Sequence, residues 1–121
     1  MRVKDVMSSK NPLVKTSTSL KDAIIKMTEF GFGAVTVVGT DGKLKGVFTD
    51  GDLRRLLQKE GEHILDKKIG DLEYKTPVSI DAEALLNEAA GVFKKTSVDT
   101  ILILENGKPV GMLDIQDLKE E

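Results

Sequence analysis

The chain contains two copies of one pattern, and this repeat constrains its fold more than any other feature. When the sequence is shifted by 66 positions, residues 3–6 fall on 69–72 and the apolar run 34–38 falls on 100–104. After one deletion in the next turn the shift becomes 65, and Gly46 falls on Gly111. A repeat of this length, present only twice, predicts a domain with twofold pseudo-symmetry rather than a solenoid array. Such a domain usually holds its sites in the clefts between the halves.

Each copy shows the same order of helix signals. Apolar residues recur at positions i, i+3, i+4 and i+7 from Leu20 to Met27, which predicts a helix over 19–30. The same spacing recurs from Leu86 to Phe93. A brief strand around residues 13–14 precedes the first helix, and a second helix begins near Leu53.

The strand signals are equally regular. The β-branched run 34–38 has no polar face and predicts a buried strand. Asp41-Gly42 and Asn106-Gly107 lie between apolar runs, which is the strongest short signal for a hairpin. The segment 44–48 is then the returning strand. Each copy therefore reads β-α-β-β-α, and the fold class is α+β.

These patterns also predict the domain boundaries. We expect the first repeat over residues 1–60, a polar linker over 61–68 and the second repeat over 69–121, with its last helix shortened. Since each small sheet with its helices would leave one face exposed, the two repeats are expected to pack against each other.

Composition excludes several classes of function. The net charge of −2 gives no electrostatic footprint for nucleic acid. No apolar run approaches the roughly 20 residues of a membrane span, and the first residues lack a signal-peptide core. The absence of cysteine excludes disulfides and thiolate chemistry, and it fits a reducing cytoplasm. With a single histidine, His63, the chain is poor in catalytic side chains, so we expect no catalytic residue in it.

The segment from Gly46 to Asp52 admits a structural and a functional interpretation. Thr49 and Asp52 have the spacing of a capping box at the start of an apolar helix. In the functional interpretation, Asp52 accepts hydrogen bonds from a ribose diol and Thr49 offers its hydroxyl to a phosphate. Two carboxylates in this first turn, Asp50 and Asp52, repel phosphate. Any phosphate would therefore need cations from elsewhere, and the candidates are Lys15, Lys75 and Arg54.

The double β-α-β-β-α order and the Gly-x-x-Thr-x-x-Asp sequence resemble a cystathionine-β-synthase (CBS) domain pair, also called a Bateman module. The resemblance covers residues 3–118. It implies a regulatory module that binds adenosine or other nucleotides between the repeats and relays this to an attached enzyme or transporter.

A narrower resemblance lies in Gly46–Arg55, which is similar to a stretch in the C-terminal CBS pair of arabinose-5-phosphate isomerases. That family supplies the precursor of Kdo, a sugar of lipopolysaccharide, and a separate N-terminal sugar-isomerase domain carries its catalysis. The resemblance implies that this chain is the regulatory module and that such a domain is its partner in the parent protein.

The CBS resemblance also assigns a first ligand site. Thr49 and Asp52 match the phosphate and ribose positions. The two walls of the base pocket match two short segments, namely Gly33, Ala34 and Val35 on one side and Val14, Lys15 and Thr16 on the other.

The second copy departs from the pattern because Asp114 stands where a threonine is expected. A carboxylate there repels phosphate, so the second cleft is expected to be empty or to prefer a neutral or cation-bridged ligand. Its candidate residues are Ser79, Thr100, Asp114 and Asp117. No metal site is expected, because Asp50-Gly51-Asp52 lacks the other ligands of a calcium loop.

Three functions remain open from sequence. The first is an isomerase module that binds an effector such as AMP, ATP or a CMP-Kdo-like nucleotide sugar, without a required cofactor. The second is a stand-alone sensor of adenine nucleotides, and the third is a purely structural dimerisation module. A self-contained enzyme is the weakest interpretation. In each of the first three we expect a cytoplasmic homodimer that pairs through its helices.

Overall fold

The structure is a computed structural model, and it describes residues 1–119 of the chain. Residues 120–121, which end the predicted second repeat, lie outside the described residues. The chain divides into two compact units. We call residues 12–76 the first unit, and residues 1–11 together with the chain from Pro77 onward the second unit.

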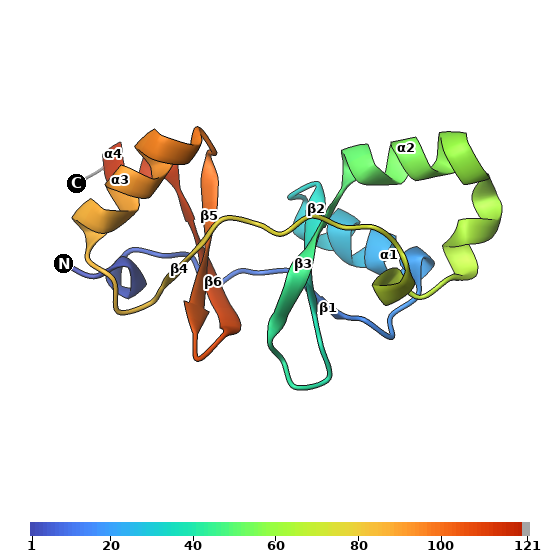
Figure 1. Ribbon diagram of the computed structural model, residues 1–121, viewed down its shortest axis with the longest axis horizontal. Helices are drawn as coiled ribbons and strands as arrows, with labels where there is room; N and C mark the ends of the chain where they lie inside the picture. Colours follow the sequence, from blue (N-terminus) through green and yellow to red (C-terminus); the bar gives the residue numbers. More distant parts are fainter. Residues whose placement is uncertain (120–121) are drawn as a thin grey trace. The chain divides into compact units, whose positions relative to one another are not determined.

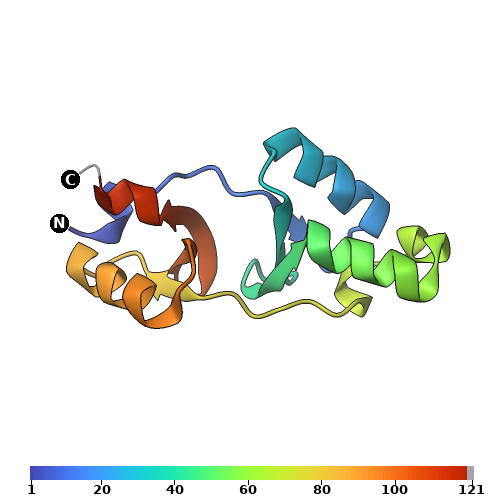
Figure 2. The ribbon, with the colours of Figure 1, turned by 90° about the horizontal axis from the view of Figure 1, so that it is seen from above.

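The first unit is a three-stranded sheet with two helices on one of its faces (Figures 1 and 2). The strand order is β1-β2-β3, with β1 parallel and β3 antiparallel to β2. The elements are β1 (Leu13–Lys15), α1 (Leu20–Phe30), β2 (Ala34–Val38), β3 (Leu44–Thr49) and α2 (Asp50–Glu60).

The second unit repeats this arrangement with strand order β4-β5-β6. Its elements are the 3₁₀ helix η1 (Val3–Asp5), β4 (Ser79–Asp81), α3 (Leu86–Thr96), β5 (Thr100–Glu105), β6 (Lys108–Asp114) and α4 (Ile115–Lys119). The α+β class and the β-α-β-β-α order predicted for each copy are confirmed. No helix among the described residues is long and apolar enough to cross a membrane.

Local sequence accounts for most element boundaries. The Ser19 hydroxyl accepts a hydrogen bond from the Asp22 amide at 3.1 Å and so caps α1. The predicted strand 34–38 has the bounds of β2, and four of its five residues are buried. Asn106 and Gly107 both have positive φ angles, 55° and 80°, as a two-residue hairpin turn between β5 and β6 requires.

The boundaries of the compact units differ from those of the sequence repeats. Residues 1–11 belong to the second unit and residues 61–76 to the first, and we call these two stretches the leading segments. Val3 is fully buried in the core of the second unit, beside Phe93 and Leu113. Ile64 and Ile69 are fully buried in the core of the first unit.

The segment 61–68, which we expected to be a linker, is therefore part of the packing of the first unit. It contains the 3₁₀ helix η2 (Glu62–Asp66), which contacts both α1 and α2. This mainly polar segment contains two apolar side chains, Ile64, which is buried in the core, and Leu65, which packs against it. A further 3₁₀ turn, η3 (Ile69–Asp71), follows it.

The leading segments also add a bridge at the edge of each sheet. Lys75 exchanges two backbone hydrogen bonds with Val47 in β3, at 2.8 and 3.1 Å. Ser8 and Met112 in β6 do the same, both at 2.9 Å. Gly46 permits this close approach, because a Cβ there would lie 2.7 Å from the Lys75 carbonyl oxygen and would overlap the Tyr74 ring.

We predict that Gly46→Ala destabilises the protein by about 1–3 kcal/mol, because the added methyl group overlaps the docked segment. Denaturant unfolding measures the change. Gly91→Ala in α3 is the matched control, since a Cβ there has open space, and it should stabilise by up to about 1 kcal/mol. An unfolding midpoint for Gly46→Ala equal to the wild-type value would contradict the proposed packing.

We predict that Ile64→Ala costs about 2–5 kcal/mol, the usual range for truncating a buried isoleucine. The neighbouring exposed change His63→Ala should stay within about 0.5 kcal/mol of wild type. Both variants are compared by urea unfolding followed by circular dichroism. If the two variants unfold alike, η2 does not belong to the core of the first unit.

Candidate functional site

The turn from β3 into α2 is held by a reciprocal cap between Thr49 and Asp52. The Thr49 hydroxyl accepts a hydrogen bond from the Asp52 amide at 3.2 Å. Asp52 Oδ2 in turn accepts from the Thr49 amide at 2.9 Å and from the Thr49 hydroxyl at 3.0 Å. The predicted capping box is confirmed, and it fixes both side chains at the start of α2.

The other carboxylate oxygen of Asp52 faces two cations. Arg55 Nη2 lies 2.5 Å from Asp52 Oδ1, and Lys75 Nζ lies 3.8 Å from it. The Asp52 side chain is only 10% exposed, whereas those of Arg55 and Lys75 are 62% and 67% exposed. An almost buried carboxylate thus lies beneath two basic side chains that reach the solvent.

Of the cations that the sequence suggested for a phosphate, the structure brings Lys75 to Asp52. The ion pair of Arg54 or Lys15 with Asp52 is not observed among the described residues. Sequence reasoning missed Arg55, although the spacing of Asp52 and Arg55 is the i, i+3 spacing that joins side chains on one helix face.

Asp52 is held in its ionised form. Burial raises the pKa of this carboxyl, but the hydrogen bonds from Thr49 and Arg55 and the charge of Lys75 together outweigh burial. The pKa of Asp52 consequently lies below its ordinary value of 3.8. At neutral pH the site therefore presents a charged acceptor.

One predicted wall of the base pocket lies beside this cap. Ala34 is paired with Thr49 across the β2–β3 ladder, and the Asp50 amide donates to the Gly33 carbonyl at 2.9 Å. The structure thus brings Gly33 and Ala34 together with Thr49 and Asp52. Val35 is fully buried in the core, so it contributes only backbone to any such wall.

The other predicted wall lies farther along the sheet. Val14 pairs with Val37, Lys15 pairs with Val38, and the Thr16 amide donates to the Val38 carbonyl. These partners are three and four residues beyond Ala34 on β2, or about 10 Å and more at 3.3 Å per residue. The structure does not bring Val14, Lys15 and Thr16 beside Ala34 in the sheet.

Pro12 lies closer to the cap end of the sheet, and sequence reasoning named it only as the entry to the first strand. Its carbonyl accepts a hydrogen bond from the Thr36 amide at 2.8 Å. The available signal was the proline itself, which marks the start of β1.

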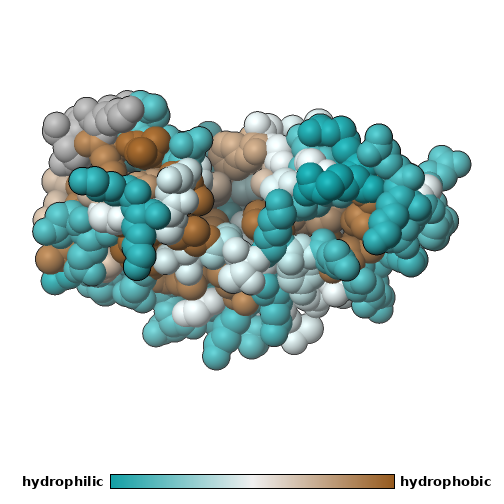
Figure 3. Space-filling model, turned by 45° about the horizontal axis from the view of Figure 1, so that its top comes forward, coloured by the Kyte–Doolittle hydropathy of each residue, from teal (hydrophilic) through white to brown (hydrophobic). Residues whose placement is uncertain are grey.

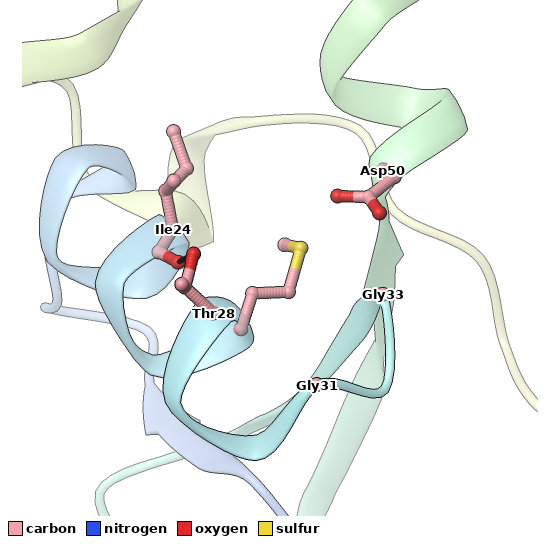
Figure 4. Close-up of a pocket in the computed structure, with 6 residues that line it drawn as sticks. Ile24, Thr28, Gly31, Gly33 and Asp50 are labelled. Atoms are coloured by element: carbon pink, nitrogen blue, oxygen red, sulfur yellow. Dashed lines mark hydrogen bonds between the residues drawn. The ribbon is translucent and has the colours of Figure 1, made fainter.

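Besides a hollow of about 450 Å³ that is lined by Gly51, Arg54, Arg55, Leu57 and Gln58, two hollows of the first unit contain a carboxylate from the first turn of α2. One, of about 200 Å³, lies between the end of α1 and the start of α2, and Figure 4 shows the Asp50 carboxylate directed across it toward α1. Its floor is apolar, since Ile24 and Met27 line it. The other, of about 210 Å³, is lined by Asp52, Arg55, Leu56, Lys59 and Glu73.

The second unit places its candidates at the equivalent turn. Thr100 pairs with Asp114 across the β5–β6 ladder, and its hydroxyl lies 3.3 Å from Asp114 Oδ2. The Asp114 amide donates to Asp117 Oδ2 at 2.8 Å. Ser79 pairs with Leu102, two residues beyond Thr100 on β5, so only three of the four candidates adjoin one another.

The two turns differ in charge. Asp114 and Asp117 make no ion pair with any lysine or arginine side chain that the structure describes, whereas Asp52 has two. Within the described part of the chain, no group of three or more acidic or histidine side chains could hold a metal ion.

We predict that Asp52→Asn lowers stability by about 1–2 kcal/mol at neutral pH, as expected for a weakened helix cap. Because the folded-state pKa of Asp52 is depressed, its contribution is present above about pH 4 and is lost as pH falls through the folded-state pKa. The difference between wild type and variant in urea unfolding should therefore shrink below pH 4. A difference that is independent of pH from 7 to 3 would contradict this.

Comparison with known proteins identifies the family. The sequence pattern of the CBS domain matches residues 3–59 and 69–121. The chain belongs to the CBS-domain family and carries two such domains in tandem. The predicted resemblance to a CBS pair is confirmed.

The most similar characterised sequences include arabinose 5-phosphate isomerases. The chain is 34% identical over 121 residues to the isomerase KdsD of Pseudomonas aeruginosa, which covers 98% of this chain and 37% of that protein. It is 32% identical over 117 residues to the isomerase KpsF of Escherichia coli O6:H1, covering 96% and 36%. The chain thus spans little more than a third of these relatives.

Solved structures of CBS proteins share the fold. CBSX2, solved in complex with AMP, has a TM-score of 0.77 and 28% identity, covering 98% of this chain and 93% of CBSX2. An uncharacterised conserved protein of Pyrococcus horikoshii has a TM-score of 0.73 and 30% identity, with coverage of 98% and 89%. Hypoxic Response Protein I, solved with two coordinated zinc ions, has a TM-score of 0.81 at 23% identity, which shows the fold alone, with coverage of 100% and 98%.

Proposed function

We propose that this CBS pair binds a nucleotide or nucleotide-sugar effector through its first unit and regulates an arabinose-5-phosphate isomerase. The observation that carries the proposal is the Asp52 carboxylate, which is ionised, 10% exposed and flanked by two cations. It lies on the cap that adjoins Gly33 and Ala34.

Ribose recognition fits the chemistry of Asp52. A carboxylate accepts two hydrogen bonds from a vicinal diol, and hydrogen bonds to a charged acceptor are stronger than those between neutral groups. The low pKa of Asp52 keeps it an acceptor throughout the physiological range. The phosphate of the ligand is then stabilised by cations beside the cap, in addition to the Thr49 hydroxyl.

The parent enzyme is proposed from similarity. The isomerases KdsD and KpsF match nearly all of this chain, which is about a third of their own length. We propose that the full-length protein carries an N-terminal sugar-isomerase domain and forms a homodimer through its CBS pairs. We propose a CMP-Kdo-like end product as the effector, with AMP, the ligand in the CBSX2 structure, as the generic alternative.

Regulation requires linkage between the effector and the isomerase. The effector must bind one conformation of the CBS pair more tightly than another, or it shifts no equilibrium. Reciprocity supplies a check in the full-length protein, because arabinose 5-phosphate should change the affinity for the effector by the same factor.

Binding to wild type and to Asp52→Asn is measured by calorimetry with AMP, ATP, CMP and CMP-Kdo. We predict that at least one of the four binds to wild type and that Asp52→Asn weakens it by about 10- to 100-fold, since a charged acceptor is lost. Asp117→Asn, the equivalent change in the second unit, is the matched control and should leave the same affinity within about threefold.

Three outcomes would contradict the proposal. Unaltered binding by Asp52→Asn would remove Asp52 from the ribose site. Absence of binding by all four compounds would favour a structural dimerisation module, whereas binding of AMP or ATP without any effect on an isomerase would favour a stand-alone sensor.

A further inference from the structure

Both carboxylate oxygens of Asp52 already have partners in this structure. Oδ2 accepts two hydrogen bonds from Thr49, one of them from the backbone, and these hold the cap together. Oδ1 accepts from Arg55 at 2.5 Å and lies 3.8 Å from Lys75 Nζ. Oδ1 can accept a further hydrogen bond, but a diol that approaches it from the solvent meets the Arg55 guanidinium there.

Arg55 is the partner that can leave. The Thr49 contacts are part of the chain turn, so their loss would open the start of α2. The Arg55 guanidinium, by contrast, is at the end of a long side chain that is 62% exposed. Exposed ion pairs contribute little net stability, so rearranging this one costs the fold little.

A neutral nucleoside and a nucleotide differ in whether they supply a new anionic partner for the Arg55 guanidinium. A nucleoside diol displaces the guanidinium from a carboxylate and leaves it only water. A phosphate offers the displaced guanidinium a second anion in the bidentate geometry that arginine prefers. The Asp52–Arg55 ion pair thus competes with the ligand for Asp52. A phosphorylated ligand replaces this ion pair more readily than a neutral ligand does.

The surroundings of Arg55 favour an anion. Lys59 lies one helical turn beyond Arg55, and both line the hollow of about 210 Å³ that contains Asp52. Lys75 approaches Asp52 from the edge of the sheet. Glu73 is the one further carboxylate in the lining of this hollow. The α2 side of the first unit is covered mainly by hydrophilic residues, as Figure 3 shows.

We infer that Arg55 determines ligand class at this site, selecting phosphorylated nucleotides over neutral nucleosides by exchanging Asp52 for the ligand phosphate. The inference rests on the proposed function, since it requires that Asp52 receives the ribose. It also accounts for how a helix start with two carboxylates can accept a phosphate, because the exchange places the guanidinium between the ribose-binding carboxylate and the phosphate.

The test compares AMP with adenosine and CMP with cytidine by calorimetry on wild type, Arg55→Gln and Arg55→Lys. We expect Arg55→Gln to weaken the nucleotide at least tenfold and to leave the nucleoside unchanged or tighter. The ratio of the two affinities then falls at least tenfold. Arg55→Lys should give an intermediate ratio, because it keeps the charge and loses the bidentate geometry.

Arg54→Gln is the matched control. Arg54 is the adjacent exposed arginine on α2, and it forms no ion pair with any residue that the structure describes. Its replacement removes the same charge from the same helix and should change the ratio by less than threefold. Equal thermal unfolding of the Gln variants establishes that each is folded.

The outcomes separate this inference from the proposed function. If Arg55→Gln weakens nucleotide and nucleoside equally, or affects neither, while Asp52→Asn still weakens binding, the role of Arg55 is overturned and the site stands. A similar loss of selectivity in Arg54→Gln would also overturn it, because general charge would then explain the preference. If wild type binds none of AMP, ATP, CMP and CMP-Kdo, the proposed function fails, and the inference fails with it.

Discussion

The burial of leading-segment side chains is the constraint on which both units depend. The core of each three-stranded sheet and its two helices includes side chains from outside its own repeat. Ile64 and Ile69 fill the first core and Val3 fills the second. Gly46 and Gly111 then let the same segments dock against β3 and β6. Neither repeat is a complete folding unit by its sequence boundaries.

The cap at the start of α2 joins stability and recognition in one pair of side chains. Thr49 and Asp52 satisfy the first amides of the helix, which would be needed in any protein with this turn. The same bonds depress the pKa of Asp52 and hold its second oxygen toward Arg55 and Lys75. In the second unit Asp114 takes the place of Thr49, and no described cation pairs with it, so the equivalent turn has a different electrostatic character.

Sequence reasoning succeeded where the signal was local. Helical spacing gave α1 and α3, the β-branched run gave the bounds of β2, and the Thr-x-x-Asp spacing gave the cap. It was weaker where the outcome depends on register or packing. The parallel pairing of β1 with β2 fixes how far Val14–Thr16 lie from Ala34, which no spacing along the chain could reveal, and the assignment of these residues to a pocket wall stays a prediction. Ile64 was hidden in a polar segment, and Arg55 was passed over in favour of Arg54.

The sequence alone determined the duplication, the α+β class, the family and the chemical difference between Thr49 and Asp114, since each of these is written in residue types and their order. The tertiary structure decided which segment completes which core and which cations reach Asp52. Both depend on contacts between residues distant in the chain, such as Lys75 with Asp52 and Ile64 with α1 and α2. Such contacts arise from the burial of apolar surface and from strand register, and composition and periodicity do not encode either one locally.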